Sequence, residues 1–283
     1  MIPIHAYHRP QTLEEALTLL QRDPSSAPLA GGTDLIPSRP QDVQAVVDLQ
    51  ALGLDQISVE GFWLHIGATV SLQRLVGSQG AGELLVEAAR LEGPLTYRHA
   101  ATVGGTIATG DPVSHVLIAL LALDAAVHLR LPDPATVSLD RILDDPRKFL
   151  DGGIITGVTA LSTAGAPGTA MARVARTPRD WPIVAAAVRV IREGEVCSSA
   201  RIALAGVAER PVRAYAAEGR LKGRPFDEES LKAALAILVD SVEPQSDYRG
   251  SGEYRREMAA VLTRRALHEA WEKLVQQPAG AAR

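Results

Sequence analysis

The chain has 283 residues, with 29 lysines and arginines against 33 aspartates and glutamates, and its formal net charge is -4. This balance provides no basic field for nucleic acid or an anionic membrane, and aromatic residues, at 4%, are too few for stacking on single strands. The one cysteine, Cys197, excludes an internal disulfide. It also excludes an iron–sulfur cluster held by this chain alone, because a cluster needs about four thiolates.

The N-terminus lacks the basic start and apolar core of a signal peptide. The longest strongly apolar run, Val116–Leu123, is far shorter than the ~20 residues that a membrane-spanning helix needs. We therefore expect a soluble, cytoplasmic protein with no membrane span.

The first 55 residues predict a small parallel sheet. Ile2–Tyr7 has the pattern of a short strand. Thr12, followed three residues later by Glu15, forms a capping box at the start of an amphipathic helix. Two more strands are predicted at Pro28–Ala30 and Ala45–Leu49, and the order of strand, helix and strands favours parallel pairing.

From residue 56 the pattern is typical of an α+β domain with a mostly antiparallel sheet. Ile57–Val59 and Trp63–Ile66 flank Glu60-Gly61, which predicts a hairpin. The elements predicted next are helices at Leu72–Val76 and Gly82–Arg90, a loop rich in Gly and Thr at Thr96–Pro112, a helix at Val113–Leu123, and strands at Ala125–Leu131, Thr136–Leu139 and Ile154–Thr159, with Asp144-Asp145 in a solvated turn.

A smaller region follows a predicted linker at residues 165–168. Its three predicted strands are Met171–Arg176, Ile183–Ile191 and Arg201–Val207, with a turn at Glu193-Gly194. Helices follow, one capped by Asp227 and another at Glu253–Val275, and residues 277–283 are expected to fray.

Two loops contain Gly-Gly-Thr, one at Leu29–Leu35 and one at Ala101–Ile107. Glycines let a backbone approach an oxygen-rich ligand closely, and consecutive N–H groups in such loops form an anion nest. Two nests that converge would hold a pyrophosphate without a lysine. A single Gly-Gly-Thr is more often a tight turn, and neither loop matches a dinucleotide fingerprint or a P-loop, so the residues alone leave both interpretations open.

These loops, LAGGTDL near residue 30 and TVGG near residue 103, resemble the paired FAD pyrophosphate loops of one flavoprotein family. It comprises the FAD-binding medium subunits of molybdenum hydroxylases of the xanthine dehydrogenase and carbon monoxide dehydrogenase type. YHRPQTLEEALTLL resembles the opening of these proteins, and SDYRGSGEYRR at residues 246–256, followed by VLTRRAL, resembles their C-terminal signature. The resemblance covers nearly the whole chain.

The resemblance implies an α+β fold in two domains. Residues 1–168 would form a two-part FAD-binding domain of the vanillyl-alcohol oxidase (PCMH) type, with subdomains of about 1–55 and 56–168. Residues 169–283 would form a small α+β domain with a three-stranded sheet plus helices. The implied cofactor is FAD. The implied partners are an iron–sulfur (2Fe-2S) subunit and a molybdopterin-binding large subunit, in a heterotrimer or its dimer.

Carried over residue by residue, the resemblance implies a set of cofactor-binding residues. They are Ala30, Gly31, Gly32, Thr33, Asp34, Leu35, Thr102, Val103, Gly104, Gly105, Thr106, Asp111, His115 and Arg173. No catalytic side chain and no metal ligand is predicted, since the histidines lack metal-ligand spacing and no nucleophile elbow is present.

The chain departs from the family pattern at three positions. Thr106 stands where relatives carry Asn, His115 replaces the second acid of Asp-Pro-x-x-Asp, and Met171 replaces the Tyr of Tyr-x-Lys-x-x-Arg. His115 either contacts the cofactor or is a polar residue at a helix start. Arg173 either supplies a cation near the flavin N1–O2 edge or is an exposed strand arginine.

By resemblance, the chain is an electron-transfer flavoprotein subunit. It would take electrons from the iron–sulfur subunit and pass them to an external acceptor. Two alternatives stay open. One is a flavin-poor assembly subunit of the same complex, which the departures at Thr106 and His115 motivate. The other is a stand-alone flavin oxidoreductase.

Overall fold

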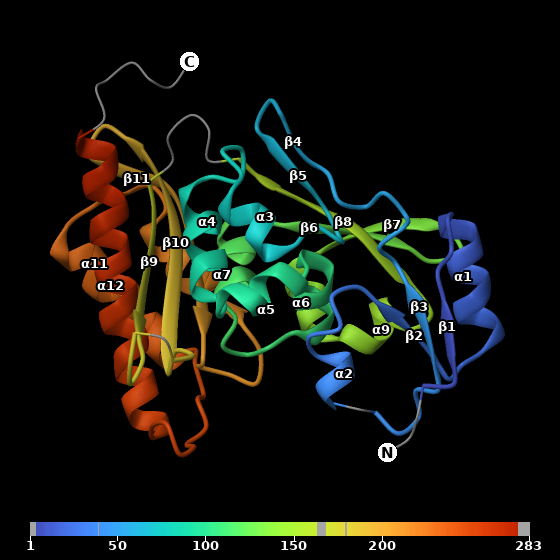
Figure 1. Ribbon diagram of the computed structural model, residues 1–283. Coiled ribbons are helices and arrows are strands. Elements are labelled where there is room, and N and C mark those ends of the chain that lie inside the picture. The colour runs from blue at the N-terminus through green and yellow to red at the C-terminus, as the bar shows by residue number, and fades with distance from the viewer. Residues whose placement is uncertain (1–3, 39, 163–167, 179, 277–283) are drawn as a thin grey trace.

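The computed structural model describes residues 4–38, 40–162, 168–178 and 180–276. Three β-sheets follow one another along the molecule, with the N-terminal sheet at one end and the C-terminal sheet with its helices at the other (Figure 1). The start of the predicted first strand, most of the predicted linker and the predicted frayed tail lie outside the described residues.

The N-terminal sheet is parallel, as predicted. It contains β1 (Ala6–His8), β2 (Ser26–Leu29) and β3 (Ala45–Asp48) in the order β1-β3-β2. Helix α1 (Leu13–Arg22) begins after its N-cap Thr12, whose Oγ1 accepts a hydrogen bond from the Glu15 backbone N–H at 3.2 Å. Its apolar face packs on β3 in a small separate core. The short helix α2 (Leu35–Ser38) follows the first glycine loop.

The central sheet is antiparallel throughout, with strand order β4-β5-β8-β6-β7. The predicted hairpin is confirmed, because Glu60 pairs with Trp63. Its strands are β4 (Ile57–Glu60), β5 (Trp63–Gly67), β6 (Ala126–Arg130), β7 (Pro134–Ser138) and β8 (Ile154–Leu161). Its helices are α3 (Leu72–Val76), α4 (Glu83–Leu91), α5 (Leu95–Ala100), α6 (Val103–Thr109), α7 (His115–Ala122), α8 (Leu139–Asp144) and α9 (Pro146–Leu150).

The loop predicted at Thr96–Pro112 is wrong, because α5 and α6 occupy most of it. Glycine disfavours a helix by about 1 kcal/mol relative to alanine, so the composition predicted a loop. Two contacts outweigh that preference. The N-cap Thr102 accepts from the Gly105 N–H, and Gly104 packs directly on Ala68. Likewise Asp145, predicted in a solvated turn, caps α9 by accepting from the Lys148 N–H at 3.2 Å.

The C-terminal sheet contains the three predicted strands and two short additional ones. The three are β9 (Gly168–Val174), β10 (Val184–Glu193) and β11 (Val196–Ala205), paired antiparallel. The short strands β12 (Val212–Arg213) and β13 (Arg224–Pro225) both pair with β11. Helices α10 (Tyr215–Leu221), α11 (Glu228–Asp240) and α12 (Gly252–Gln276) pack on one face. Asp227 caps α11 as predicted, 2.8 Å from the Ser230 N–H.

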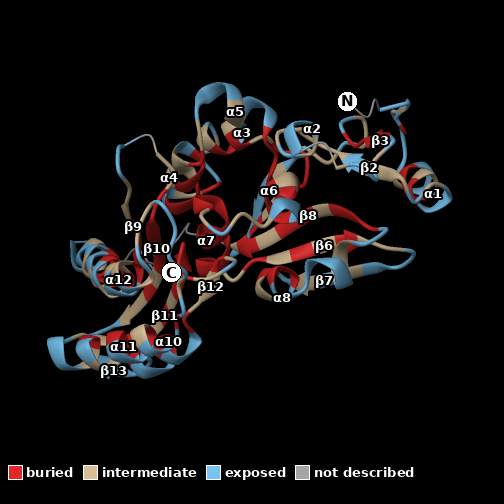
Figure 2. Ribbon diagram, turned by 90° about the horizontal axis from the view of Figure 1, so that it is seen from below, coloured by how far each residue is buried: buried red, intermediate tan, exposed pale blue. Residues whose placement is uncertain are grey.

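Helix α7 joins the central and C-terminal regions through one continuous core. All eight of its residues are buried, and Figure 2 shows it among red, buried segments. The face of the C-terminal sheet turned toward α7 presents small side chains that belong to the same core, namely Ala185, Ala187, Ala203 and Ala205. A helix that is apolar on all sides requires such enclosure. The predicted domain boundary at residue 168 therefore divides a shared core, and it stays a prediction.

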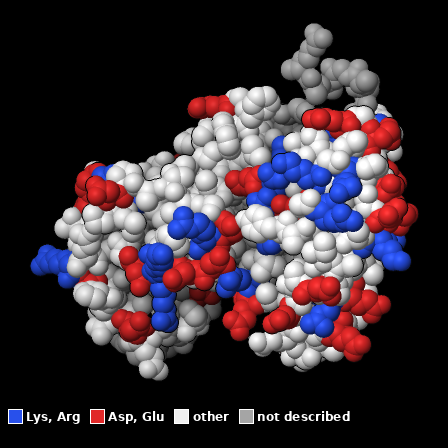
Figure 3. Space-filling model, turned by 180° about the vertical axis from the view of Figure 1, so that it is seen from behind, with Lys and Arg blue, Asp and Glu red and all other residues white. Residues whose placement is uncertain are grey.

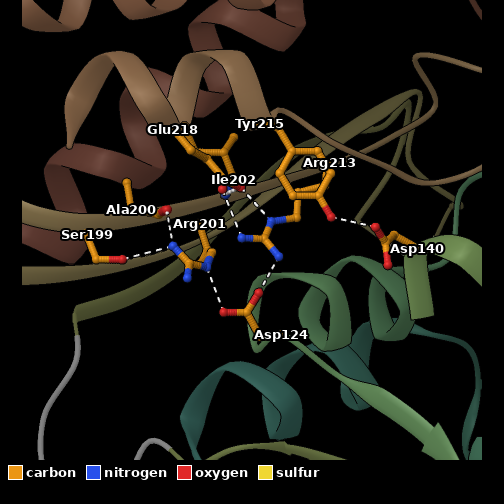
Figure 4. Close-up of polar contacts among 9 residues, drawn as sticks. All are labelled: Asp124, Asp140, Ser199, Ala200, Arg201, Ile202, Arg213, Tyr215 and Glu218. Carbon is orange, nitrogen blue, oxygen red and sulfur yellow. Dashed lines mark hydrogen bonds and ion pairs between the residues drawn. The ribbon is translucent and has the colours of Figure 1, made fainter. Parts of the chain in front are cut away.

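A polar network closes this junction at the end of α7 (Figure 4). Asp124, which has a positive φ of 52°, accepts from Arg201 Nε at 2.7 Å and from Arg213 Nη1. Arg213 also forms a two-point pair with Glu218, with Nε–Oε1 and Nη2–Oε2 distances of 2.7 and 2.9 Å. Tyr215 Oη donates to Asp140 at 2.5 Å. The two-point pair fixes the orientation of Arg213 within the C-terminal region, and the contacts of Asp124 and Asp140 join the two regions.

The surface is mixed in character. On the back of the molecule, Lys and Arg side chains lie beside Asp and Glu (Figure 3). The tip of the β4–β5 hairpin exposes Phe62 and Trp63, at 76% and 48% of their surface. Across the described ranges, no helix combines the length and the apolar character needed to cross a bilayer.

Candidate functional site

A cavity of about 320 Å³ lies where the two glycine loops meet. Ligand pockets in proteins have volumes of roughly 300 Å³ and above. The first loop follows β2 of the N-terminal sheet, and the second opens α6 beside the central sheet. The predicted site residues that line the cavity are the six from Ala30 to Leu35, and Thr102, Gly104, Gly105 and Thr106.

The first loop leaves its backbone donors available. A Cβ at Gly31 would lie 2.0 Å from the carbonyl oxygen of Ala100, so only glycine lets this loop lie against the chain that leads into the second loop. Gly32 has a φ of +68°, in the left-handed region that favours glycine. Among the described residues, no acceptor takes a hydrogen bond from the N–H groups of residues 31–34. These groups are therefore free donors at the cavity wall.

The second loop uses its backbone donors internally. The N–H groups of Val103 and Gly104 donate to the carbonyls of the β5–α3 segment, at 3.0 and 2.8 Å. Those of Gly105 and Thr106 donate to Oγ1 and the carbonyl of Thr102, at 3.1 and 2.9 Å. Among the described residues, only the first loop leaves its N–H groups without an acceptor, and an anion nest there stays a prediction. The second loop instead brings α6 against the sheet and gives the cavity a wall of small residues.

Thr102 and Thr106 differ in what they offer to a ligand. Thr102 Oγ1 accepts from the Gly105 N–H, which leaves its hydroxyl proton available. The Thr106 hydroxyl donates to the Thr102 carbonyl at 3.0 Å. Thr106, where relatives carry Asn, therefore presents only acceptor capacity to the cavity.

Val103 and His115 lie in the protein interior, outside the cavity lining. Both side chains have no exposed surface. The backbone N–H groups of His115 and Val116 donate to the buried carboxylate of Glu92, at 2.8 and 3.1 Å, so Glu92 occupies the N-terminus of α7. Sequence reasoning missed Glu92, because it precedes His115 by 23 residues and no local pattern links the two.

Asp111 and Arg173 also lie outside the lining. The Arg173 guanidinium donates to the backbone carbonyls of Asp180, at 2.9 Å, and Pro178. Asp111 Oδ1 accepts from the Val113 N–H at 2.9 Å. Burial raises the pKa of the Asp111 carboxyl, and the negative charges of Glu92 and Asp34 raise it further. Asp111 thus lies within electrostatic reach of the first glycine loop, and its role in cofactor binding stays a prediction.

Tyr97 on α5 is a cavity residue that the sequence did not reveal, since it falls in the segment predicted as a loop. Burial raises its pKa above that of free tyrosine, so the phenol is neutral near pH 7. Thr33 of the first loop acts in the opposite direction and lowers this pKa. The Tyr97 ring meets that of Trp181 edge to face, with centroids 6.5 Å apart. Tyr97 therefore connects the cavity to the C-terminal region.

Two family profiles match the chain. The profile of the FAD binding domain in molybdopterin dehydrogenase matches residues 3–159, and that of the CO dehydrogenase flavoprotein C-terminal domain matches residues 169–270. The carbon monoxide dehydrogenase medium chain of Afipia carboxidovorans is 33% identical over 93% of this chain and 96% of its own length. The glyceraldehyde dehydrogenase medium chain of Sulfolobus acidocaldarius is 28% identical over 94% and 98%.

Solved structures agree with this match. Carbon monoxide dehydrogenase from Hydrogenophaga pseudoflava superposes with a TM-score of 0.91 at 31% identity, covering 97% of this chain and 99% of that one. Quinoline 2-oxidoreductase from Pseudomonas putida 86 superposes with a TM-score of 0.86 at 26% identity, covering 97% and 99%. The N–H groups of residues 31–34, which no described residue accepts, and the small residues that line the cavity fit the pyrophosphate of a bound dinucleotide. The chain belongs to the family of FAD-binding medium subunits of molybdenum hydroxylases, which includes the medium chain of carbon monoxide dehydrogenase.

Proposed function

We propose that this chain holds FAD in the cavity between the glycine loops and transfers electrons from an iron–sulfur subunit to an external acceptor. The observation that carries the proposal is the meeting of the two loops at one cavity, with the N–H groups of residues 31–34 free. When bound, FAD supplies the ability to accept and release two electrons one at a time.

The available groups fit the pyrophosphate of FAD. Its oxygens only accept hydrogen bonds, and the backbone N–H groups of residues 31–34 are donors that no described residue accepts. The Thr102 hydroxyl adds one donor from the opposite wall. Leu49, Ala68 and Ile155 contribute apolar surface to the lining, which excludes water from the bound cofactor. The chain's task is to bind and orient FAD, and the N–H groups do this without a lysine in the cavity lining.

The partners follow from the same proposal. We infer a 2Fe-2S subunit as electron donor and a molybdopterin-binding large subunit as the site of substrate oxidation, in a heterotrimer or its dimer. The support is that relatives matched over almost their whole length are the medium chains of such dehydrogenases.

The departures from the family pattern do not favour a flavin-poor assembly subunit. His115 and Met171 are both buried away from the cavity lining, so the cavity wall is unaffected by either. Thr106 lines the cavity and retains acceptor capacity.

The visible absorption spectrum of the purified chain tests the proposal. We expect flavin bands at about one FAD per chain, either as purified or after incubation with FAD. A colourless chain that also fails to bind added FAD would contradict it. Substrate turnover by the isolated chain, without partner subunits, would support the stand-alone flavin oxidoreductase instead.

A further inference from the structure

The first glycine loop is bonded by a side chain that lies outside the cavity lining. The parallel strands β2 and β3 end side by side, with Leu29 beside Asp48 (Figure 1). Just past these ends, Gln50 Nε2 donates to the backbone carbonyl of Ala30 at 2.9 Å. Ala30 lines the cavity, whereas Gln50 does not. The bond therefore reaches the loop from outside the cavity lining.

The position of Gln50 is itself fixed by Asp48, the last residue of β3. Asp48 Oδ1 accepts a hydrogen bond from the Gln50 backbone N–H at 2.9 Å, and this contact turns the chain directly after the strand. The other carboxylate oxygen accepts from Tyr7 Oη on β1 and lies 3.7 Å from Arg9 Nε. Asp48 is only 6% exposed, so these partners hold its carboxylate, and with it the backbone of Gln50, in one place.

The bond to the Ala30 carbonyl also sets the direction of the next N–H group. In a planar trans peptide, the C=O and N–H bonds point to opposite sides of the chain. The carbonyl of Ala30 points to Gln50, so the N–H of Gly31 points the other way. Among the residues that the structure describes, none accepts a hydrogen bond from this N–H. Gln50 thus directs a free donor away from itself, where Ala30 and Gly31 line the cavity.

Without this bond, the peptide between Ala30 and Gly31 has a second orientation available. Rotation of the peptide plane by about half a turn changes φ of Gly31, and glycine adopts positive φ about as readily as negative φ. In the rotated form a carbonyl oxygen would replace the N–H at the cavity and repel the negative oxygens of a pyrophosphate. Close approach to Ala100 requires glycine at position 31, and the same glycine permits the rotation that Gln50 opposes.

We propose that Gln50 is a positioning residue for the cofactor, whose side-chain amide holds the Ala30–Gly31 peptide with its N–H toward the FAD pyrophosphate. The inference rests on the proposed function, and it requires no contact between Gln50 and FAD. Tyr7 and Asp48 support the same peptide through Gln50, so the order of the N-terminal sheet is passed to the loop.

Two substitutions of Gln50 in the full chain test the proposal through the Kd for FAD, measured by fluorescence quenching. Gln50→Met keeps the length of the side chain but removes the donor. We expect its Kd to rise about fivefold to tenfold, the effect of one lost hydrogen bond. Gln50→Lys retains a donor and should restore most of the affinity. Both are measured at about 1 M salt, where the Debye length is about 3 Å and the added charge contributes little.

The phosphorus NMR spectrum of bound FAD separates positioning from stability. At saturating FAD, a rotated peptide changes the surroundings of a phosphate, so at least one resonance should shift in Gln50→Met and return in Gln50→Lys. Gln50 is exposed, so the melting temperature of the FAD-free Gln50→Met chain should fall by no more than about 2 °C.

Gln56→Met is the matched control. Gln56 is also exposed, and its amide bonds the Asp55 side chain at 3.0 Å, outside the cavity lining. The same substitution there should change neither the Kd for FAD, nor the phosphorus resonances, nor the melting temperature.

Three results separate the possible failures. A Kd of Gln50→Met within about twofold of the unaltered chain, with unchanged phosphorus resonances, would overturn the role of Gln50. A higher Kd with unchanged resonances at saturation and a clearly lower melting temperature would also overturn it, because Gln50 would then act on stability alone. An unaltered chain that binds no FAD would overturn the proposed function and this inference with it.

Discussion

The loop after β2 and the loop that opens α6 both contain Gly-Gly-Thr, but their backbone N–H groups differ in whether the protein itself accepts their hydrogen bonds. Residues 31–34 offer donors that no described residue accepts, whereas residues 103–106 donate to Val70, Ala68 and Thr102. The first loop lies in an irregular segment between a strand and a short helix. The second loop is the first turn of α6, so Gly104 serves close packing and Thr102 serves as the N-cap.

The comparison teaches that a glycine pair marks where a backbone comes close to something, without stating to what. At Gly31 the close neighbour is the Ala100 backbone, and at Gly104 it is Ala68. Only the hydrogen-bond pattern distinguishes a loop that binds a ligand from a loop that supports it. Four substitutions test this division of roles, and they are given in order of expected effect.

Gly31→Ala should have the largest effect. Its Cβ would lie 2.0 Å from a backbone oxygen that no side-chain rearrangement can move, so the two loops would separate. We expect the free energy of unfolding to fall by about 3 kcal/mol. We also expect the purified protein to lose FAD. Thermal unfolding and the flavin spectrum measure both. Gly219→Ala is the control, because nothing lies within 4 Å of a Cβ there.

Gly104→Ala should mainly reduce stability. Its Cβ would lie 2.8 Å from the Ala68 Cβ and 2.9 Å from the Ala68 carbonyl oxygen, so α6 would shift slightly. We expect a loss of about 2 kcal/mol in denaturant unfolding, with FAD affinity reduced less than in Gly31→Ala. Equal loss of FAD affinity in the two variants would show that the loops are equivalent, and our distinction between them would be wrong.

Thr102→Ala removes both the N-cap of α6 and one donor to the cavity. Loss of an N-cap costs about 1 kcal/mol, and the loss should appear in the free energy of unfolding without FAD. FAD binding, measured by fluorescence quenching, should weaken as well. Thr102→Ser restores the hydroxyl, and failure of serine to restore both quantities would contradict the assigned role.

Asp111→Asn should have the smallest effect, and its sign depends on pH. Because the folded pKa of Asp111 is raised, the folded state binds its proton more tightly than the unfolded state does. The carboxyl therefore disfavours folding increasingly as pH rises from the ordinary Asp pKa, about 3.9, through the raised value. We expect the stability difference between Asp111→Asn and the unaltered chain to move in favour of the variant over this window. A difference that is independent of pH would contradict the raised pKa.

Much of the fold was predictable from local patterns. The parallel N-terminal sheet, the Glu60-Gly61 hairpin, the three C-terminal strands and the Asp227 cap all arise from residues close together in the sequence. Helix α6 was not predictable, because its stability comes from Ala68 and Val70, more than thirty residues away.

The candidate site likewise has a part that was predicted from the sequence and a part that was not. The glycine loops were identified by resemblance, and the structure brings them to one cavity. Tyr97 and Glu92 were missed because their roles depend on contacts with Trp181 and with the start of α7, which are distant in sequence. The bonding of the second loop's N–H groups was likewise hidden, since two of the four donate to Ala68 and Val70, outside the motif.

The enclosure of α7 bears on how such a protein can change over evolutionary time. Two separate family profiles match this chain, which gives the appearance of interchangeable modules. Yet α7 touches the alanine face of the C-terminal sheet, and Asp124 at its end is held by two arginines of that sheet. A recombination breakpoint between the two profiles would join an α7 to a sheet that had not been matched to it. The two segments are therefore constrained to be inherited together, and divergence in one must be compensated in the other.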